Sequence, residues 1–142
     1  MTDVITSDLI RLHGSARTRD DAIREVGTLL VDAGAVDQAY ADAMFDRENS
    51  VSTYMGNELA IPHGTNEAKD GIHRSALAFV RYDEPIDWDG NPVRFAVGIA
   101  GQGDEHLEIL SSIALAFSDD AQLARLKSAE DPADVLAVLQ DS

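Results

Sequence analysis

The sequence has no cysteine among its 142 residues. Disulfides, thiolate metal sites and a cysteine nucleophile within this chain are therefore excluded, and any thiol chemistry must belong to a partner. The sequence also lacks the run of roughly 18 to 20 apolar residues that crosses a bilayer, and its first residues show no basic end followed by an apolar block. We therefore expect a cytoplasmic protein that is not secreted.

Basic residues are scarce. Eleven Lys and Arg stand against 26 Asp and Glu, which gives a formal charge of -15. Such a charge opposes binding to nucleic-acid phosphates and to anionic lipid surfaces, so we expect no nucleic-acid partner. An acidic surface favours recognition of a basic protein, although acidity alone also serves solubility.

The chain shows no internal repeat, low-complexity tract or linker, and 44% of its residues are hydrophobic. We therefore predict a single domain over residues 1–142 with one sizeable core. Apolar spacing of three and four predicts helices at residues 18–33, 36–47, 104–118, 120–127 and 131–139. Short apolar runs predict strands at residues 59–61, 75–82 and 93–100, the last two forming a hairpin. The fold class is α/β, a single compact domain with a small central mixed sheet flanked by helices, whose strand order cannot be read from the sequence.

Local signals mark several element ends. Thr18 is a candidate N-cap and Gly34 a candidate C-cap for the first helix. The polar group at residues 46–50 is expected to open a loop after the second helix. Asp104 is the expected cap of the third helix, and Trp88 is expected to pack in the core rather than to contact a ligand.

His63 is the first candidate for chemistry. Pro62 ends the preceding strand, and Gly64 leaves space beside the imidazole. A neutral imidazole, with a reference pKa of about 6.5, has one nitrogen lone pair that can attack phosphorus. The other nitrogen needs a hydrogen-bond acceptor, which the sequence does not identify. The alternative from local chemistry alone is a structural or surface histidine.

His106 is the second candidate, because the glycine-rich residues 101–104 place it in the first turn of a helix. Unpaired amides and the positive end of the helix dipole favour an anion there, so His106 and these amides are expected to meet a phosphate oxygen together. The alternative is a histidine near a helix cap with no ligand.

Arg47 is the third candidate, because a guanidinium after the second helix can bind a phosphoryl group through charge-assisted hydrogen bonds. The alternative is an ordinary surface ion pair with Asp46 or Glu48. His13 and His73 have no nucleophile-like setting, and we interpret both as structural or surface residues.

Several motifs together resemble the mannitol/fructose class (type 2) of enzyme IIA of the bacterial phosphoenolpyruvate-dependent sugar phosphotransferase system. They are Arg47-Glu48, Ser52-Thr53-Tyr54-Met55-Gly56-Asn57, Leu59-Ala60-Ile61-Pro62-His63-Gly64-Thr65, Glu67-Ala68-Lys69, Val97-Gly98-Ile99-Ala100 and Glu105-His106-Leu107. Their order spans nearly the whole chain and forms a specific combination. The segment from His63 to Lys69 resembles the mannitol branch.

The resemblance implies that His63 accepts phosphate from the histidine-containing phosphocarrier protein and passes it to a cysteine of an enzyme IIB domain on another chain. It implies supporting roles for His106 and Arg47, no cofactor and no metal, and a separate membrane IIC component that moves the sugar. The alternatives within this class are a fructose-specific component and a regulatory domain that signals through its phosphorylation state. A metal-dependent hydrolase using His63 and His106 is a further alternative, which their spacing does not favour.

Overall fold

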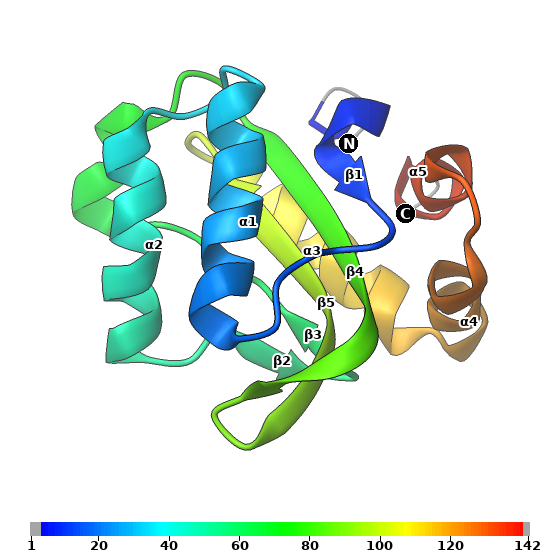
Figure 1. Cartoon of the computed structure of the whole chain (residues 1–142). Helices are drawn as coiled ribbons and strands as arrows, with labels where there is room; N and C mark the ends of the chain where they lie inside the picture. The colour runs from blue at the N-terminus through cyan, green and yellow to red at the C-terminus, as the bar shows by residue number, and fades with distance from the viewer. Residues whose placement is uncertain (1–3, 141–142) are drawn as a thin grey trace.

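In the computed structural model, which describes residues 4–140, five strands form a mixed sheet with helices on both faces (Figure 1). The strands are β1 (Ile10–Arg11), β2 (Tyr54–Gly56), β3 (Leu59–Ala60), β4 (Ala76–Trp88) and β5 (Asn91–Ala100). The helices are α1 (Arg19–Asp32), α2 (Gln38–Ser50), α3 (Glu105–Ser118), α4 (Asp120–Ser128) and α5 (Pro132–Gln140), with 3-10 helices η1 (Ser7–Leu9) and η2 (Asn66–Gly71). The predicted α/β class and compact architecture are confirmed; residues 1–3 and 141–142 of the predicted domain lie outside the described part.

The sheet order is β1-β4-β5-β3-β2. The central pair, β4 and β5, is the predicted antiparallel hairpin, whereas β1 runs parallel to β4 and β3 runs parallel to β5. Helices α1 and α2 cover one face, and α3, α4 and α5 lie on the other side (Figure 1). This is the strand order that the sequence left open.

Strand β4 alternates between two hydrophobic cores because successive side chains of a strand point to opposite faces. Ala76, Ala78 and Val80 belong to the core shared with α1 and α2. Leu77 and Phe79 belong to the core shared with α3 and α5. A strand buried on both faces reads as a continuous apolar run, which explains why the run from residue 75 was recognisable in the sequence.

Helix α1 approaches the sheet closely because β5 carries small side chains on that face. Ala96 and Ala100 belong to the core on the α1 side. Between them, a Cβ added at Gly98 would lie 2.8 Å from the Cβ of Val26 in α1. A larger residue at position 98 would therefore push the helix off the sheet.

Both predicted ends of α1 are confirmed. The hydroxyl of Thr18 accepts a hydrogen bond from the first-turn backbone. Gly34 has a φ of 75°, and the N–H groups of Gly34 and Ala35 donate to the carbonyls of Val31 and Leu30 at 2.9 and 3.0 Å. This is the Schellman arrangement that a glycine after a helix favours.

Helix α2 continues through residues 46–50, so the prediction that this polar group opens a loop is wrong. Glu48, although charged, is only 3% exposed. Its carboxylate accepts hydrogen bonds from the Thr53 backbone N–H at 2.8 Å and from Nε1 of Trp88 at 3.0 Å. Because buried donors satisfy this carboxylate, the polar sequence stays helical, and Trp88 packs in the core as predicted.

Two hairpin turns also differ from the expectation. The predicted β4–β5 turn narrows to Asp89 and Gly90, both with positive φ, so the strands extend through the segment expected to connect them. A second two-residue turn, at Asn57 and Glu58, joins β2 to β3 and also has positive φ at both positions. Such turns match the twist of the strands they join. The short strands β1 and β2 were not predicted because few residues define them.

A second buried carboxylate, Glu25 of α1, ties the helix to the sheet. It accepts hydrogen bonds from Arg11 Nη1 at 2.6 Å, from the backbone N–H groups of Ser15 and Ala16 at 3.1 and 3.3 Å, and from the Tyr82 hydroxyl at 2.9 Å. Burial favours the neutral acid, but the hydrogen bonds from Ser15, Arg11 and Tyr82 outweigh burial and lower the pKa of Glu25. The ionised form therefore stabilises the folded state.

Glu25→Ala is expected to lower the free energy of unfolding by about 3 kcal/mol, because buried donors lose their acceptor. Urea unfolding at pH 7 measures this loss. The stabilisation by Glu25 is present above the ordinary carboxyl pKa of 4.5 and is lost as the pH falls through its lowered folded-state value, so the difference from wild type should shrink in acid. Asp21→Ala, which removes an exposed partner of Arg24 in the same helix, is the control and should cost less than about 1 kcal/mol. Equal losses in the two variants would refute the assignment.

Candidate functional site

Two segments far apart in the sequence meet at the ends of β3 and β5. The Ile99 N–H donates to the carbonyl of Pro62 at 2.9 Å, and His63 pairs with Ile99 in an isolated parallel bridge. Because the two strands are parallel, the chain leaves both at the same edge of the sheet. His63 therefore lies beside His106, with the ring centroids 5.7 Å apart and the ring planes at 61°.

His63 is held with one ring nitrogen available. Its Nδ1 lies 2.8 Å from the carbonyl oxygen of Ile61. A carbonyl only accepts hydrogen bonds, so Nδ1 carries the proton and Nε2 has the free lone pair. Burial is the main cause of a lowered His63 pKa; the Ile61 bond opposes it, and the charges of Arg47 and His106 add to it. The imidazole is therefore neutral near pH 7.

Tyr40 of α2 fixes the segment that follows His63. Its hydroxyl donates to the Ile99 carbonyl at 2.8 Å and accepts from the Gly64 N–H. A Cβ added at Gly64 would lie 2.5 Å from Cε1 of the Tyr40 ring. Glycine at this position therefore permits the close approach of Tyr40, a role that the sequence did not indicate.

Side-chain hydrogen bonds hold the loop that precedes His106 in place. Gln102 donates from Nε2 to the Ile72 carbonyl and from its backbone N–H to Oγ of Ser75, both at 2.9 Å. The Ser75 hydroxyl in turn donates to Oε1 of Glu105 at 2.9 Å. These bonds join the loop before α3 to the segment before β4 and fix the first turn of α3, where His106 lies as predicted.

The expected free amides at the start of α3 are not all available. The N–H groups of Glu105 and His106 donate to the carbonyls of Gln102 and Gly103, at 3.1 and 3.4 Å. Asp104 precedes α3 as expected, but its backbone is already helical and its side chain makes no capping bond. The prediction that backbone amides join His106 in meeting an anion is therefore wrong for these two groups.

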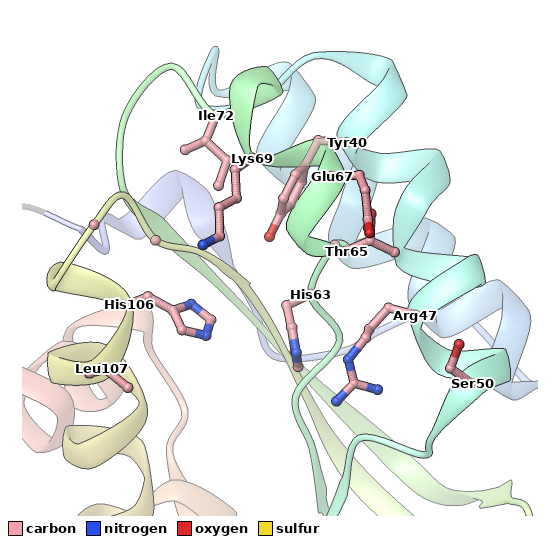
Figure 2. Close-up of a pocket in the computed structure, with 13 residues that line it drawn as sticks. Tyr40, Arg47, Ser50, His63, Thr65, Glu67, Lys69, Ile72, His106 and Leu107 are labelled. Carbon is pink, nitrogen blue, oxygen red and sulfur yellow. The ribbon is translucent and has the colours of Figure 1, made fainter.

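Arg47 lies in the last turn of α2, not after it. Its Nη1 donates to the Val51 carbonyl at 2.6 Å, and Figure 2 shows the guanidinium beside His63. Within residues 4–140, Arg47 has no carboxylate close enough for an ion pair, so the alternative pairing with Asp46 or Glu48 is not observed.

All three predicted residues line one cavity of about 510 Å³, together with Tyr40 and Lys69 (Figure 2). Neither Tyr40 nor Lys69 was predicted as a site residue. Tyr40 belongs to a helix predicted from its apolar spacing, and Lys69 belongs to the motif Glu67-Ala68-Lys69. The exposed His13 pairs with Asp83, and the exposed His73 does not line the cavity, in agreement with surface roles.

The described part of the chain contains no group of three or more His, Asp or Glu side chains placed to hold a metal ion. Within residues 4–140 there is also no helix that is both long and apolar enough to span a membrane.

Residues 3–142 match the family model described as "Phosphoenolpyruvate-dependent sugar phosphotransferase system, EIIA 2", and the chain belongs to this family. Its relatives carry a more particular name. A "Mannitol-specific phosphotransferase enzyme IIA component" of Halalkalibacterium halodurans is 48% identical, over 96% of this chain and 94% of the relative. The protein of the same name from Staphylococcus aureus is 43% identical, over 100% of this chain and 99% of the relative.

A solved structure has the same fold as this chain. In the complex of enzyme IIA mannitol with phosphorylated enzyme IIB mannitol from Escherichia coli, the matching chain superposes with a TM-score of 0.90 at 33% identity, covering 97% of this chain and 98% of that one. The family expected from the sequence motifs is thereby confirmed.

The pKa of His63 is expected to lie below 6.5, the ordinary histidine value, in an NMR titration of the ring protons. Arg47→Ala should raise this pKa without restoring the ordinary value, because burial remains the larger cause. Arg24→Ala, which removes an exposed arginine of α1 paired with Asp21, is the control and should leave the His63 titration unchanged. A His63 pKa at or above 6.5 in the wild type would contradict this account.

Proposed function

We propose that this chain is the phosphoryl carrier of a mannitol phosphotransferase system and that it carries the phosphate on Nε2 of His63. The observation that carries the proposal is the hydrogen bond from Nδ1 to the Ile61 carbonyl, which leaves Nε2 as the nucleophile in a cavity that also contains Arg47. A neutral, fixed imidazole beside a guanidinium is suited to accept a phosphoryl group.

In the forward step, the Nε2 lone pair attacks phosphorus on the histidine-containing phosphocarrier protein. The Nε2–P bond forms, the bond from phosphorus to the donor nitrogen breaks, and its electron pair returns to the donor imidazole. In the onward step, a cysteine thiolate of an enzyme IIB domain attacks phosphorus, and the pair of the Nε2–P bond returns to His63. Neither step requires proton transfer, because His63 keeps its proton on Nδ1 throughout.

Arg47 and His106 stabilise the charge of the transferred group. Phosphoryl transfer depends mainly on positioning and on electrostatic stabilisation of the equatorial oxygens. Arg47, anchored through one nitrogen to Val51, offers its remaining N–H groups from one side of His63. The ring of His106 faces His63 from another side.

The partners follow from this chemistry and from the relatives. Because the chain has no cysteine, a thiol that accepts the phosphate must lie on another chain, and the solved relative is in complex with phosphorylated enzyme IIB. The relatives' mannitol-specific names favour mannitol over fructose. We infer that the reaction takes place in the cytoplasm. A separate membrane IIC component would take up the sugar.

His63→Ala is expected to abolish phosphorylation. Wild-type protein incubated with phosphoenolpyruvate, enzyme I and the phosphocarrier protein should gain one acid-labile phosphate, about 80 Da by intact mass. His13→Ala, which removes an exposed histidine outside the cavity, should gain the same mass. No gain in folded wild-type protein, or a gain in His63→Ala, would refute the proposal.

Arg47→Ala is expected to slow transfer to His63 about 100-fold while the fold stays intact, because it removes charge stabilisation rather than core packing. His106→Ala should also slow transfer, including the onward step to the IIB cysteine. His73→Ala, which removes an exposed histidine outside the cavity, is the matched control. Rapid-quench kinetics measure both steps; wild-type rates in Arg47→Ala and His106→Ala would remove these residues from the mechanism.

A further inference from the structure

Lys69 enters the cavity from the side opposite Arg47. It lies in η2, which follows His63 in the chain, and it lines the same cavity. Figure 2 shows its ammonium pointing into the space beside His106, whereas the guanidinium of Arg47 lies on the other side of His63. Two cations from different elements therefore flank the space in front of the His63 imidazole.

This placement is notable in a chain with a formal charge of -15. Five of its eleven Lys and Arg residues are ion-paired with carboxylates. Within residues 4–140, Lys69 and Arg47 have no such pair. Glu67 also lines the cavity, but its side chain lies beside Thr65, well separated from Lys69 (Figure 2). The ammonium is thus exposed and available to an anion.

Lys69 also acts on His106. Burial is the main cause of the lowered pKa of His106, and the charge of Lys69 lowers it further. The pairing parallels that of Arg47 with His63. Each cation thus stands near one imidazole, which keeps the imidazole neutral and leaves the positive charge on the cation.

We propose that Lys69 is a catalytic residue whose ammonium binds oxygens of the phosphoryl group on His63, from the side of His106. The inference rests on the phosphoryl-carrier function proposed above. A phosphoryl group brings a charge of about -1.5 to -2 into an already acidic protein. With Arg47 on one side and Lys69 on the other, the equatorial oxygens have a cation at both ends of the cavity.

In both transfer steps Lys69 supplies charge and hydrogen-bond donors, and it forms no covalent bond and transfers no proton. An ammonium on a flexible stem can follow the oxygens as phosphorus moves toward or away from Nε2. Arg47, bound to Val51, is more fixed. The two cations therefore have different tasks, one positioning the group and one following it.

The experiment compares Lys69→Gln with Arg125→Gln, which removes the same charge from an exposed position of α4 where the arginine donates a hydrogen bond to Gln122. Lys69→Gln should slow phosphorylation of His63 by at least about 10-fold and lower kcat more than it raises KM for the phosphocarrier protein. The ³¹P chemical shift of the phosphohistidine should also change, because its oxygens lose a ligand. Arg125→Gln should match wild type in all three, and Lys69→Arg should restore most of the rate.

The outcomes separate the two proposals. If wild-type protein takes up phosphate on His63 while Lys69→Gln matches Arg125→Gln in rate and ³¹P shift, the inference about Lys69 is wrong and the carrier function stands. A higher KM with unchanged kcat and ³¹P shift would make Lys69 a docking residue and would also overturn the inference. If folded wild-type protein takes up no phosphate, the proposed function itself fails.

Discussion

The site depends on the backbone of Ile99. Its N–H donates to the Pro62 carbonyl, and its carbonyl accepts from the Tyr40 hydroxyl. The bond to Pro62 continues the parallel pairing of β5 with β3, which is a strand of only two residues. The bond from Tyr40 joins α2 to the same residue of β5. His63 follows Pro62 directly, and the loop to His106 begins two residues after Ile99. One residue of β5 therefore positions segments from three parts of the chain.

The electrostatics of the cavity oppose those of the whole protein. The chain is strongly acidic, yet the described cavity contains two cations without carboxylate partners and two imidazoles whose pKa is lowered by burial and by those cations. Neutral histidines suit a transfer between nitrogen and sulfur nucleophiles that involves no proton. In the mechanism that we propose, Arg47 and Lys69 supply the positive charge that the phosphoryl group needs.

Stability and site geometry are linked through buried carboxylates. Glu48, next to Arg47 in α2, binds Thr53 and the indole of Trp88, and so joins the end of the helix to the long hairpin. Glu25 of α1 accepts hydrogen bonds from Arg11 of β1 and from Tyr82 of β4, and so joins this helix to the sheet. A buried carboxylate is costly unless hydrogen-bond donors satisfy its oxygens. Here those donors come from separate elements. The network therefore fixes the elements relative to one another.

The class, most helices, the central hairpin and the three residues of the candidate site could be predicted from the sequence, because helical spacing, apolar runs, caps and motif order can be read along the chain. It misplaced the end of α2 and missed β1 and β2, because Glu48 is satisfied only by Thr53 and Trp88, and because two- and three-residue strands carry little pattern. The strand order, the free nitrogen of His63 and the presence of Tyr40 and Lys69 in the cavity became apparent only from the three-dimensional arrangement. Each of these features depends on segments that the parallel pairing of β3 with β5 brings together, or on elements that pack against these strands. The spacing of residues along the chain does not indicate which strands pair.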